Sequence, residues 1–241
     1  MTFTNVFGIS FLNTTIEDLS SEIINGELSK KMVVTPNVDH IVRFHKNNDF
    51  RAVYSKADLY LNDSRILQVL SRFTKNRLTS LVTGSDLTAY LFNQLRHNEN
   101  IKIAVIGGED PVIEKVINEY DIKNVVHYNP PMGFHTQQGE IDKCVAVCKL
   151  ANPDIVFLAV GSPKQEIVAK VLRDNDVPGC YLCVGASLLY LAGEEKRAPL
   201  WVQKMHCEWF YRLSQNPKRL AKRYLVDGWG ILPVVLKERR K

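Results

Sequence analysis

Short apolar runs recur along the chain, and between them lie segments in which apolar residues return every three or four positions. Most of the runs are continuously apolar and β-branched rather than alternating, which is typical of strands covered on both faces. The pattern predicts an α/β fold with a Rossmann-like, mostly parallel sheet covered by helices. The predicted strands are 32–34, 58–61, 79–82, 101–106, 125–128, 155–160 and 180–184.

The segments between the strands carry signals for helices. Thr14-Thr15-Ile16-Glu17 has the form of a capping box that opens a helix, and Gly26 is its predicted stop. Asp39 and His40 are also expected on a helix, where adjacent side chains point in different directions, so an acid–base pair is disfavoured. The other predicted helices are 65–73, 86–96, 112–119, 140–150 and 165–173.

Length and composition narrow the class of protein. With 241 residues, the chain has the length of one large domain, or of one domain with an appendage. A hydrophobic share of 45% is usual for a chain that buries a core, and no apolar run approaches the roughly 20 residues that span a bilayer. The start, MTFTNVFG, lacks the features of a secretory signal, so we expect a cytosolic protein whose five cysteines are reduced thiols.

The net charge of +5 is unevenly distributed. Residues 196–241 contain 12 Lys and Arg and 3 Asp and Glu, a net charge of +9, whereas residues 1–195 carry 19 basic and 23 acidic residues, a net charge of −4. This predicts an α/β catalytic core over 1–195 and a basic, amphipathic, helical appendage over 196–241. Such an appendage favours an anionic partner, and nucleic acid and anionic lipid both fit at this point.

Small, polar and turn-forming residues follow the predicted strands. The carboxyl ends of parallel strands share one edge of a sheet, where ligands bind and where helix starts offer N–H groups to anions. We therefore expect a site for a small molecule that carries phosphate. Its candidate residues are Thr35, Asn37, Asp63, Gly84, Ser85, Gly107, Gly161, Lys164, Gln165 and Gly185.

Each of these signals has a structural alternative. Asp63 can act as a general base or cap the helix 65–73. The turns at Gly84-Ser85-Asp86 and Gly161-Ser162-Pro163-Lys164-Gln165 can bind phosphate, although ordinary helix starts look the same. The sequence contains neither GxGxxG nor GxxxxGK[ST], which disfavours a dinucleotide dehydrogenase and a P-loop enzyme.

Two patterns of metal-ligand type favour a structural reading. Cys180 and Cys183 have zinc-knuckle spacing, but they lie within a strand and lack a second pair. Asp174-Asn175-Asp176 resembles a metal-binding DxD, but it falls on the edge of the sheet opposite the proposed site. We expect no metal and no cofactor.

Several spaced motifs together resemble the WecG/TagA/CpsF glycosyltransferases, family 26. The resemblance covers nearly the whole chain in order. Its motifs are Thr35-Pro36-Asn37, Asp63, Thr83-Gly84-Ser85-Asp86-Leu87, Gly161-Ser162-Pro163-Lys164-Gln165-Glu166, Gly185-Ala186-Ser187, Arg197-Ala198-Pro199 with Trp201, and Glu208-Trp209-Phe210-Tyr211-Arg212-Leu213 with Pro217, Arg219 and Arg223. It implies inverting, metal-independent transfer from a nucleotide sugar, usually a uridine diphosphate (UDP) sugar, to a sugar on polyprenyl diphosphate, in cell-surface polysaccharide synthesis.

The resemblance also implies roles for individual residues. Asp63 is the implied general base, with Thr35, Asn37 and Gln165 lining the donor and acceptor pocket. Three tail arginines are implied to close over the diphosphate and to face the membrane: Arg212, Arg219 and Arg223.

Two departures from the family pattern concern the donor. Ser64 stands where many members have Gly, and Leu81 stands where many have Arg. These departures leave N-acetylmannosamine, its uronic acid and glucose open as the sugar transferred.

The implied partners are a UDP-sugar donor, a polyprenyl-diphosphate-linked acceptor and an anionic membrane surface. We expect a cytoplasmic enzyme, peripheral at the inner face of the plasma membrane, without a nucleic-acid partner. A homo-oligomer is compatible with the sequence. The alternatives are a protein that binds nucleic acid through its basic tail and a non-catalytic scaffold.

Overall fold

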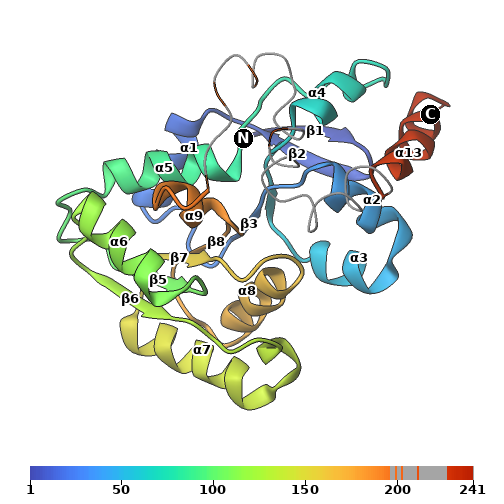
Figure 1. Cartoon of the computed structure of the whole chain (residues 1–241). Helices are drawn as coiled ribbons and strands as arrows, with labels where there is room; N and C mark the ends of the chain where they lie inside the picture. The colour runs from blue at the N-terminus through green and yellow to red at the C-terminus, as the bar shows by residue number, and fades with distance from the viewer. Residues whose placement is uncertain (196–198, 200–201, 203–210, 212–226, 241) are drawn as a thin grey trace.

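A computed structural model describes residues 1–195, 199, 202, 211 and 227–240 of the chain. Within these residues, eight strands form one sheet in the order β1-β2-β4-β3-β8-β7-β5-β6 (Figure 1). The pairing is parallel except between β1 and β2, which form an antiparallel hairpin at one edge. The strands are β1 Thr2–Val6, β2 Ile9–Asn13, β3 Met32–Val34, β4 Leu59–Tyr60, β5 Ile103–Ile106, β6 Val125–Tyr128, β7 Ile155–Leu158 and β8 Cys180–Cys183.

Helices cover both faces of the sheet. One apolar cluster joins α1, α5, α6 and α9 to one face, and a second joins α2, α3, α7 and α8 to the other (Figure 1). The α-helices are α1 Ile16–Ile24, α2 Val38–Lys46, α3 Asn48–Tyr54, α4 Arg65–Ser71, α5 Gly84–Gln94, α6 Asp110–Tyr120, α7 Gln138–Ala151, α8 Lys164–Asp174, α9 Ser187–Leu191 and α13 Ile231–Arg240. Two 3₁₀ helices are η1 Phe134–Thr136 and η3 Asp227–Gly230.

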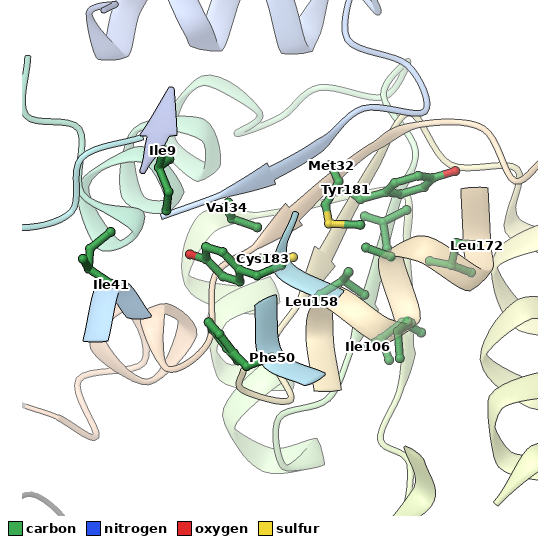
Figure 2. Close-up of a cluster of buried hydrophobic side chains, with 14 of the residues drawn as sticks. Ile9, Met32, Val34, Ile41, Phe50, Ile106, Leu158, Leu172, Tyr181 and Cys183 are labelled. Carbon is green, nitrogen blue, oxygen red and sulfur yellow. The ribbon is translucent and has the colours of Figure 1, made fainter. Parts of the chain in front are cut away.

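The central strands are buried on both sides. On β3, Met32 and Val34 join the cluster under α2, α3 and α8, whereas Val33 joins the cluster on the other face. Val34 and Cys183 belong to the same buried cluster as Phe50 of α3, and Figure 2 shows this cluster in close-up. Continuous burial of this kind explains why the strands read as uninterrupted apolar runs, and the predicted α/β fold is confirmed.

The structure corrects three local predictions. Residues 79–82 are not a strand: they have no regular secondary structure and are held to the end of β4, where Asn62 Nδ2 donates to the Ser80 carbonyl and Val82 N donates to the Asn62 carbonyl. The hairpin of β1 and β2 was not among the predicted strands. The first helix is capped one residue later than the predicted box, because Thr15 Oγ1 accepts from Asp18 N at 3.1 Å.

The C-terminal helix α13 lies beside α2 (Figure 1). Just before it, at Gly230, a Cβ atom would lie 2.7 Å from Val42 Cγ1, so this glycine lets the chain approach α2 closely. Ile231, Val234 and Val235 are buried in the contact. Within the described ranges, no helix combines the length and the apolarity that a bilayer crossing requires.

Candidate active site

The carboxyl ends of the parallel strands form one row. Pairing joins Tyr60 to Val34, Val34 to Cys183, Cys183 to Leu158 and Leu158 to Ile106. The residues that follow these strands therefore emerge along one edge of the sheet. This is the edge at which the sequence predicts the ligand site.

Asp63 connects three of the segments that meet there. Its backbone N donates to the Pro36 carbonyl at 3.2 Å, and its Oδ1 accepts from Gly84 N at 2.9 Å. A Cβ atom at Gly84 would lie 3.1 Å from Thr35 Oγ1, so Thr35 borders the same turn. The structure thus places Asp63, Thr35 and Gly84 side by side.

The alternative role of Asp63 as a helix cap is wrong. The cap of α4 is Ser64, whose Oγ accepts from Leu67 N at 3.3 Å and whose own N donates to Asn62 Oδ1. A side chain with a hydroxyl at position 64 therefore has a local structural function, whereas Asp63 points to the start of α5.

Asn37 is the N-cap of α2. Its Oδ1 accepts from Asp39 N at 3.1 Å and from His40 N at 3.4 Å, while its own backbone N donates to His40 Nδ1 at 3.2 Å. The His40 ring also stacks on Tyr54, with centroids 5.5 Å apart. His40 thus holds the predicted site residue Asn37 in place, a role that the sequence analysis missed.

Gln165 joins the start of α8 to the loop after β8. Its Oε1 accepts from Gly185 N at 3.0 Å, and its Nε2 donates to Glu166 Oε1 at 3.1 Å. Gln165 is only 5% exposed. Lys164 is the first residue of α8 and is half-buried, and at Gly161 a Cβ would meet no described atom within 4 Å.

Three predicted site glycines use their N–H groups inside the protein. Gly84 N donates to Asp63, Gly185 N donates to Gln165, and Gly107 N donates to the Tyr128 carbonyl at 2.8 Å. We call these residues the strand-end glycines. Phosphate binding at these turns stays a prediction. Because the N–H groups of the three glycines already donate within the protein, a bound phosphate would need other hydrogen-bond donors in the same turns.

Polar side chains also interact at the start of α5. Ser85 Oγ lies 3.2 Å from Thr83 Oγ1, which donates to Asp86 Oδ2 at 2.6 Å. Thr83 Oγ1 in turn accepts from Asp86 N at 3.1 Å. These bonds fix the first turn of α5 next to the Asp63 carboxylate.

Two buried titratable side chains lie near the same edge. Burial raises the pKa of Glu166, and hydrogen bonds that favour its charged form offset only part of the effect. The pKa of Tyr54 lies well above its usual value, chiefly because of burial and further because of Glu166, Cys183 and Asp63. Tyr54 is thus within electrostatic reach of both acidic residues.

The predicted tail residues Arg212, Arg219 and Arg223 lie outside the described residues. Among the residues that are described, no group of three or more His, Cys, Asp and Glu could hold a metal ion. Cys180 and Cys183 are buried within β8, where burial raises their pKa, in agreement with the structural reading.

A parallel sheet with a carboxylate and polar turns gathered at its strand ends is the framework of an enzyme that binds its substrates at that edge. Comparison with known families identifies which class of enzyme this is. The chain matches the model of the glycosyl transferase WecG/TagA/CpsF family over residues 4–241. It belongs to this family and is a glycosyltransferase, as the sequence motifs predict.

Its curated relatives are similar over most of their length. The chain is 28% identical over 235 residues to the N-acetylglucosaminyldiphosphoundecaprenol N-acetyl-beta-D-mannosaminyltransferase of Bacillus subtilis (strain 168), covering 96% of this chain and 88% of the relative. It is 25% identical over 226 residues to the protein of the same name from Staphylococcus aureus (strain MW2), covering 90% and 87%.

Proposed function

We propose that this glycosyltransferase moves a sugar from a UDP-sugar to a sugar on polyprenyl diphosphate, with inversion and without a metal ion. The names of its relatives support this acceptor class and make N-acetylmannosamine the first donor sugar to test. Its uronic acid and glucose belong in the same screen, because sequence identity of 25–28% does not fix the donor.

The placement of Asp63 carries the proposal. An acceptor hydroxyl needs a base within about 2.6–3.2 Å, and one Asp63 oxygen is fixed by the Gly84 N–H at the ligand edge. In the proposed step, the acceptor oxygen attacks the anomeric carbon opposite the diphosphate and gives its proton to Asp63. The bond from that carbon to the diphosphate oxygen breaks, and its electron pair leaves with UDP.

The departing diphosphate gathers negative charge that must be balanced. The N–H groups of the strand-end glycines already donate within the protein. We therefore assign much of this task to Lys164 and to the three tail arginines at 212, 219 and 223. In the same proposal, residues 196–241 form the basic appendage of the 1–195 core and hold the enzyme at the inner face of the plasma membrane, close to its acceptor.

The test is a donor screen on the full chain with a synthetic polyprenyl diphosphate sugar, followed by mass spectrometry. Asp63→Asn keeps an oxygen for the Gly84 N–H, removes the base, and should lower turnover by about 10²- to 10⁴-fold. Ser64→Ala is the matched control: loss of the α4 cap costs about 0.5–2 kcal/mol of stability, while the folded enzyme keeps its turnover.

Two results would count against the proposal. Full turnover of Asp63→Asn would exclude Asp63 as the base. A wild-type enzyme that transfers sugar only until EDTA is added would contradict the metal-independent mechanism.

A further inference from the structure

A buried carboxyl group lies directly behind Gln165. Glu166, in the first turn of α8, is 1% exposed, and its Oε1 accepts from Gln165 Nε2. Its Oε2 is also buried and makes no hydrogen bond to a described residue, although the Ser162 hydroxyl, which is likewise buried and unbonded, is near enough to help lower the pKa of the carboxyl. A buried carboxyl with so few hydrogen bonds is costly, so a role other than stability is expected for it.

The surroundings of Glu166 come from several elements. The helix α8 packs against α3 and β8. Besides the dominant effect of burial, Arg43 of α2 lowers the pKa of Glu166, and Glu166 raises the pKa values of Tyr54 and Cys183. Asp63 also raises the pKa of Tyr54, so both carboxyl groups act on the same tyrosine.

The bond from Gln165 to Glu166 determines how the Gln165 amide is oriented. One end of the amide accepts from Gly185 N and the other donates to Glu166 Oε1. A rotation that exchanged the two ends would set Nε2 against the Gly185 N–H, donor against donor, and the amide oxygen against the carboxyl. Gly185 and Glu166 together therefore select one orientation.

An amide held in this way still has one N–H and one oxygen lone pair to offer. We propose that Glu166 is a positioning residue that fixes the Gln165 amide so that these remaining groups face the bound substrates. This inference rests on the proposed function, in which Gln165 lines the donor and acceptor pocket. Glu166 itself does not touch the reacting atoms.

Three substitutions separate the hydrogen bond from charge and volume. Glu166→Gln keeps the acceptor oxygen and the shape, and should keep kcat/KM within about 3-fold of wild type. Glu166→Met keeps the length but removes the acceptor, and should lower kcat/KM by about 10- to 100-fold, the scale of loss for a misplaced contact. If Glu166→Met does not fold, Glu166→Asp replaces it, because a carboxyl withdrawn by one methylene should lose the bond and show a similar loss.

A double-variant cycle with Gln165→Ala distinguishes positioning from a merely structural role. Glu166→Met should change the same parameter, kcat or KM, that Gln165→Ala changes, and the double variant should be no slower than Gln165→Ala alone. Thermal unfolding of each variant reports the folded fraction, so that rates are compared per folded enzyme.

Several outcomes would overturn the inference: additive losses in the cycle, wild-type kinetics of Glu166→Met, or a loss in Glu166→Gln as large as that in Glu166→Met. The wild-type enzyme in the same assay tests the proposed function separately. Absence of transfer by wild type with every donor contradicts the proposed function, whereas normal wild-type transfer with unaffected variants contradicts only the role of Glu166.

Discussion

Gly107 offers a quantitative test of why a predicted site glycine occupies its position. Its φ is +93°, and an added Cβ would lie 2.5 Å from Val160 Cγ1 and 3.0 Å from the carbonyl carbon of Ala159. Carbon atoms in contact normally lie about 3.5–4.0 Å apart. Gly107 therefore lets the loop after β5 pack directly against the end of the β7 segment, and its N–H is already bonded to Tyr128.

The cost of Gly107→Ala has two parts. A side chain at positive φ costs about 1–2 kcal/mol, and overpacking adds about 1–3 kcal/mol, which gives about 2–5 kcal/mol in total. Gly161→Ala is the matched control, because Gly161 also has a positive φ, +76°, but a Cβ there meets no described atom within 4 Å. It should cost only the backbone part, about 1–2 kcal/mol.

Urea unfolding followed by circular dichroism measures both free energies of unfolding. Val160→Ala in the Gly107→Ala background should recover part of the loss, since it removes the closest contact but leaves the backbone atoms of Ala159 in place. The reasoning fails if Gly107→Ala is no more destabilising than Gly161→Ala. The reasoning also fails if Gly107→Ala is as stable as wild type but no longer binds UDP, because that result would show that Gly107 is needed for the ligand rather than for packing.

Two further predictions concern the buried carboxyl and the cap of α2. Because burial raises the pKa of Glu166, wild type should lose stability as the pH rises from the usual glutamate pKa, 4.5, through the raised value, and Glu166→Gln should avoid this loss. The difference in Tm between Glu166→Gln and wild type should therefore be larger at pH 7.5 than at pH 5, and a constant difference would contradict the argument. Asn37→Ala should cost about 0.5–2 kcal/mol in urea unfolding and also reduce transfer, whereas the control Thr15→Ala should show a similar cost with unchanged transfer. Equal transfer by these two cap variants would remove Asn37 from the site.

The fold could be predicted because its strands are buried on both faces. Runs such as 155–160 and 180–184 contain little besides apolar residues, and β7 and β8 are fully buried where those runs predict them. The pattern fails at the hairpin edge of the sheet and at residues 79–82. Three of the five residues of β1 are polar, and residues 79–82 are strand-like in composition but have no pairing ladder among the described residues.

The site could be predicted only as a region. Parallel strands bring their carboxyl ends together, so the closeness of Thr35, after β3, and Asp63, after β4, follows from the sheet topology. Gly84 follows no strand, and it reaches the same place because residues 79–82 are held to the end of β4. Which N–H bonds to which oxygen depends on loop conformation, and the partners are distant in sequence: Gly84 and Asp63 are 21 residues apart, and Gly185 and Gln165 are 20 apart. The capping bonds of Ser64 and His40 are different, because they join residues only three positions apart, Ser64 to Leu67 and Asn37 to His40, and so belong to the local pattern of the sequence.

The bonds of the strand-end glycines lead to a last prediction about charge. Because those N–H groups are engaged and residues 1–195 carry a net charge of −4, our proposal assigns the positive charge for the leaving diphosphate to Lys164 and, largely, to the tail. Substitution to Gln of any of the tail arginines 212, 219 and 223 should slow transfer by about 10²-fold, the typical loss when one group that stabilises a developing anion is removed.

Lys237→Gln, at an exposed position on α13, is the control for total charge. It changes the net charge by the same amount and should leave turnover at saturating acceptor unchanged. Flotation with anionic liposomes measures membrane binding separately from catalysis. Each single substitution should weaken membrane binding to a similar, small degree, so a difference in turnover between the variants would reflect catalysis. If the arginine variants lose no more turnover than Lys237→Gln, the tail contributes only general attraction to the membrane, and another source of positive charge must balance the leaving group.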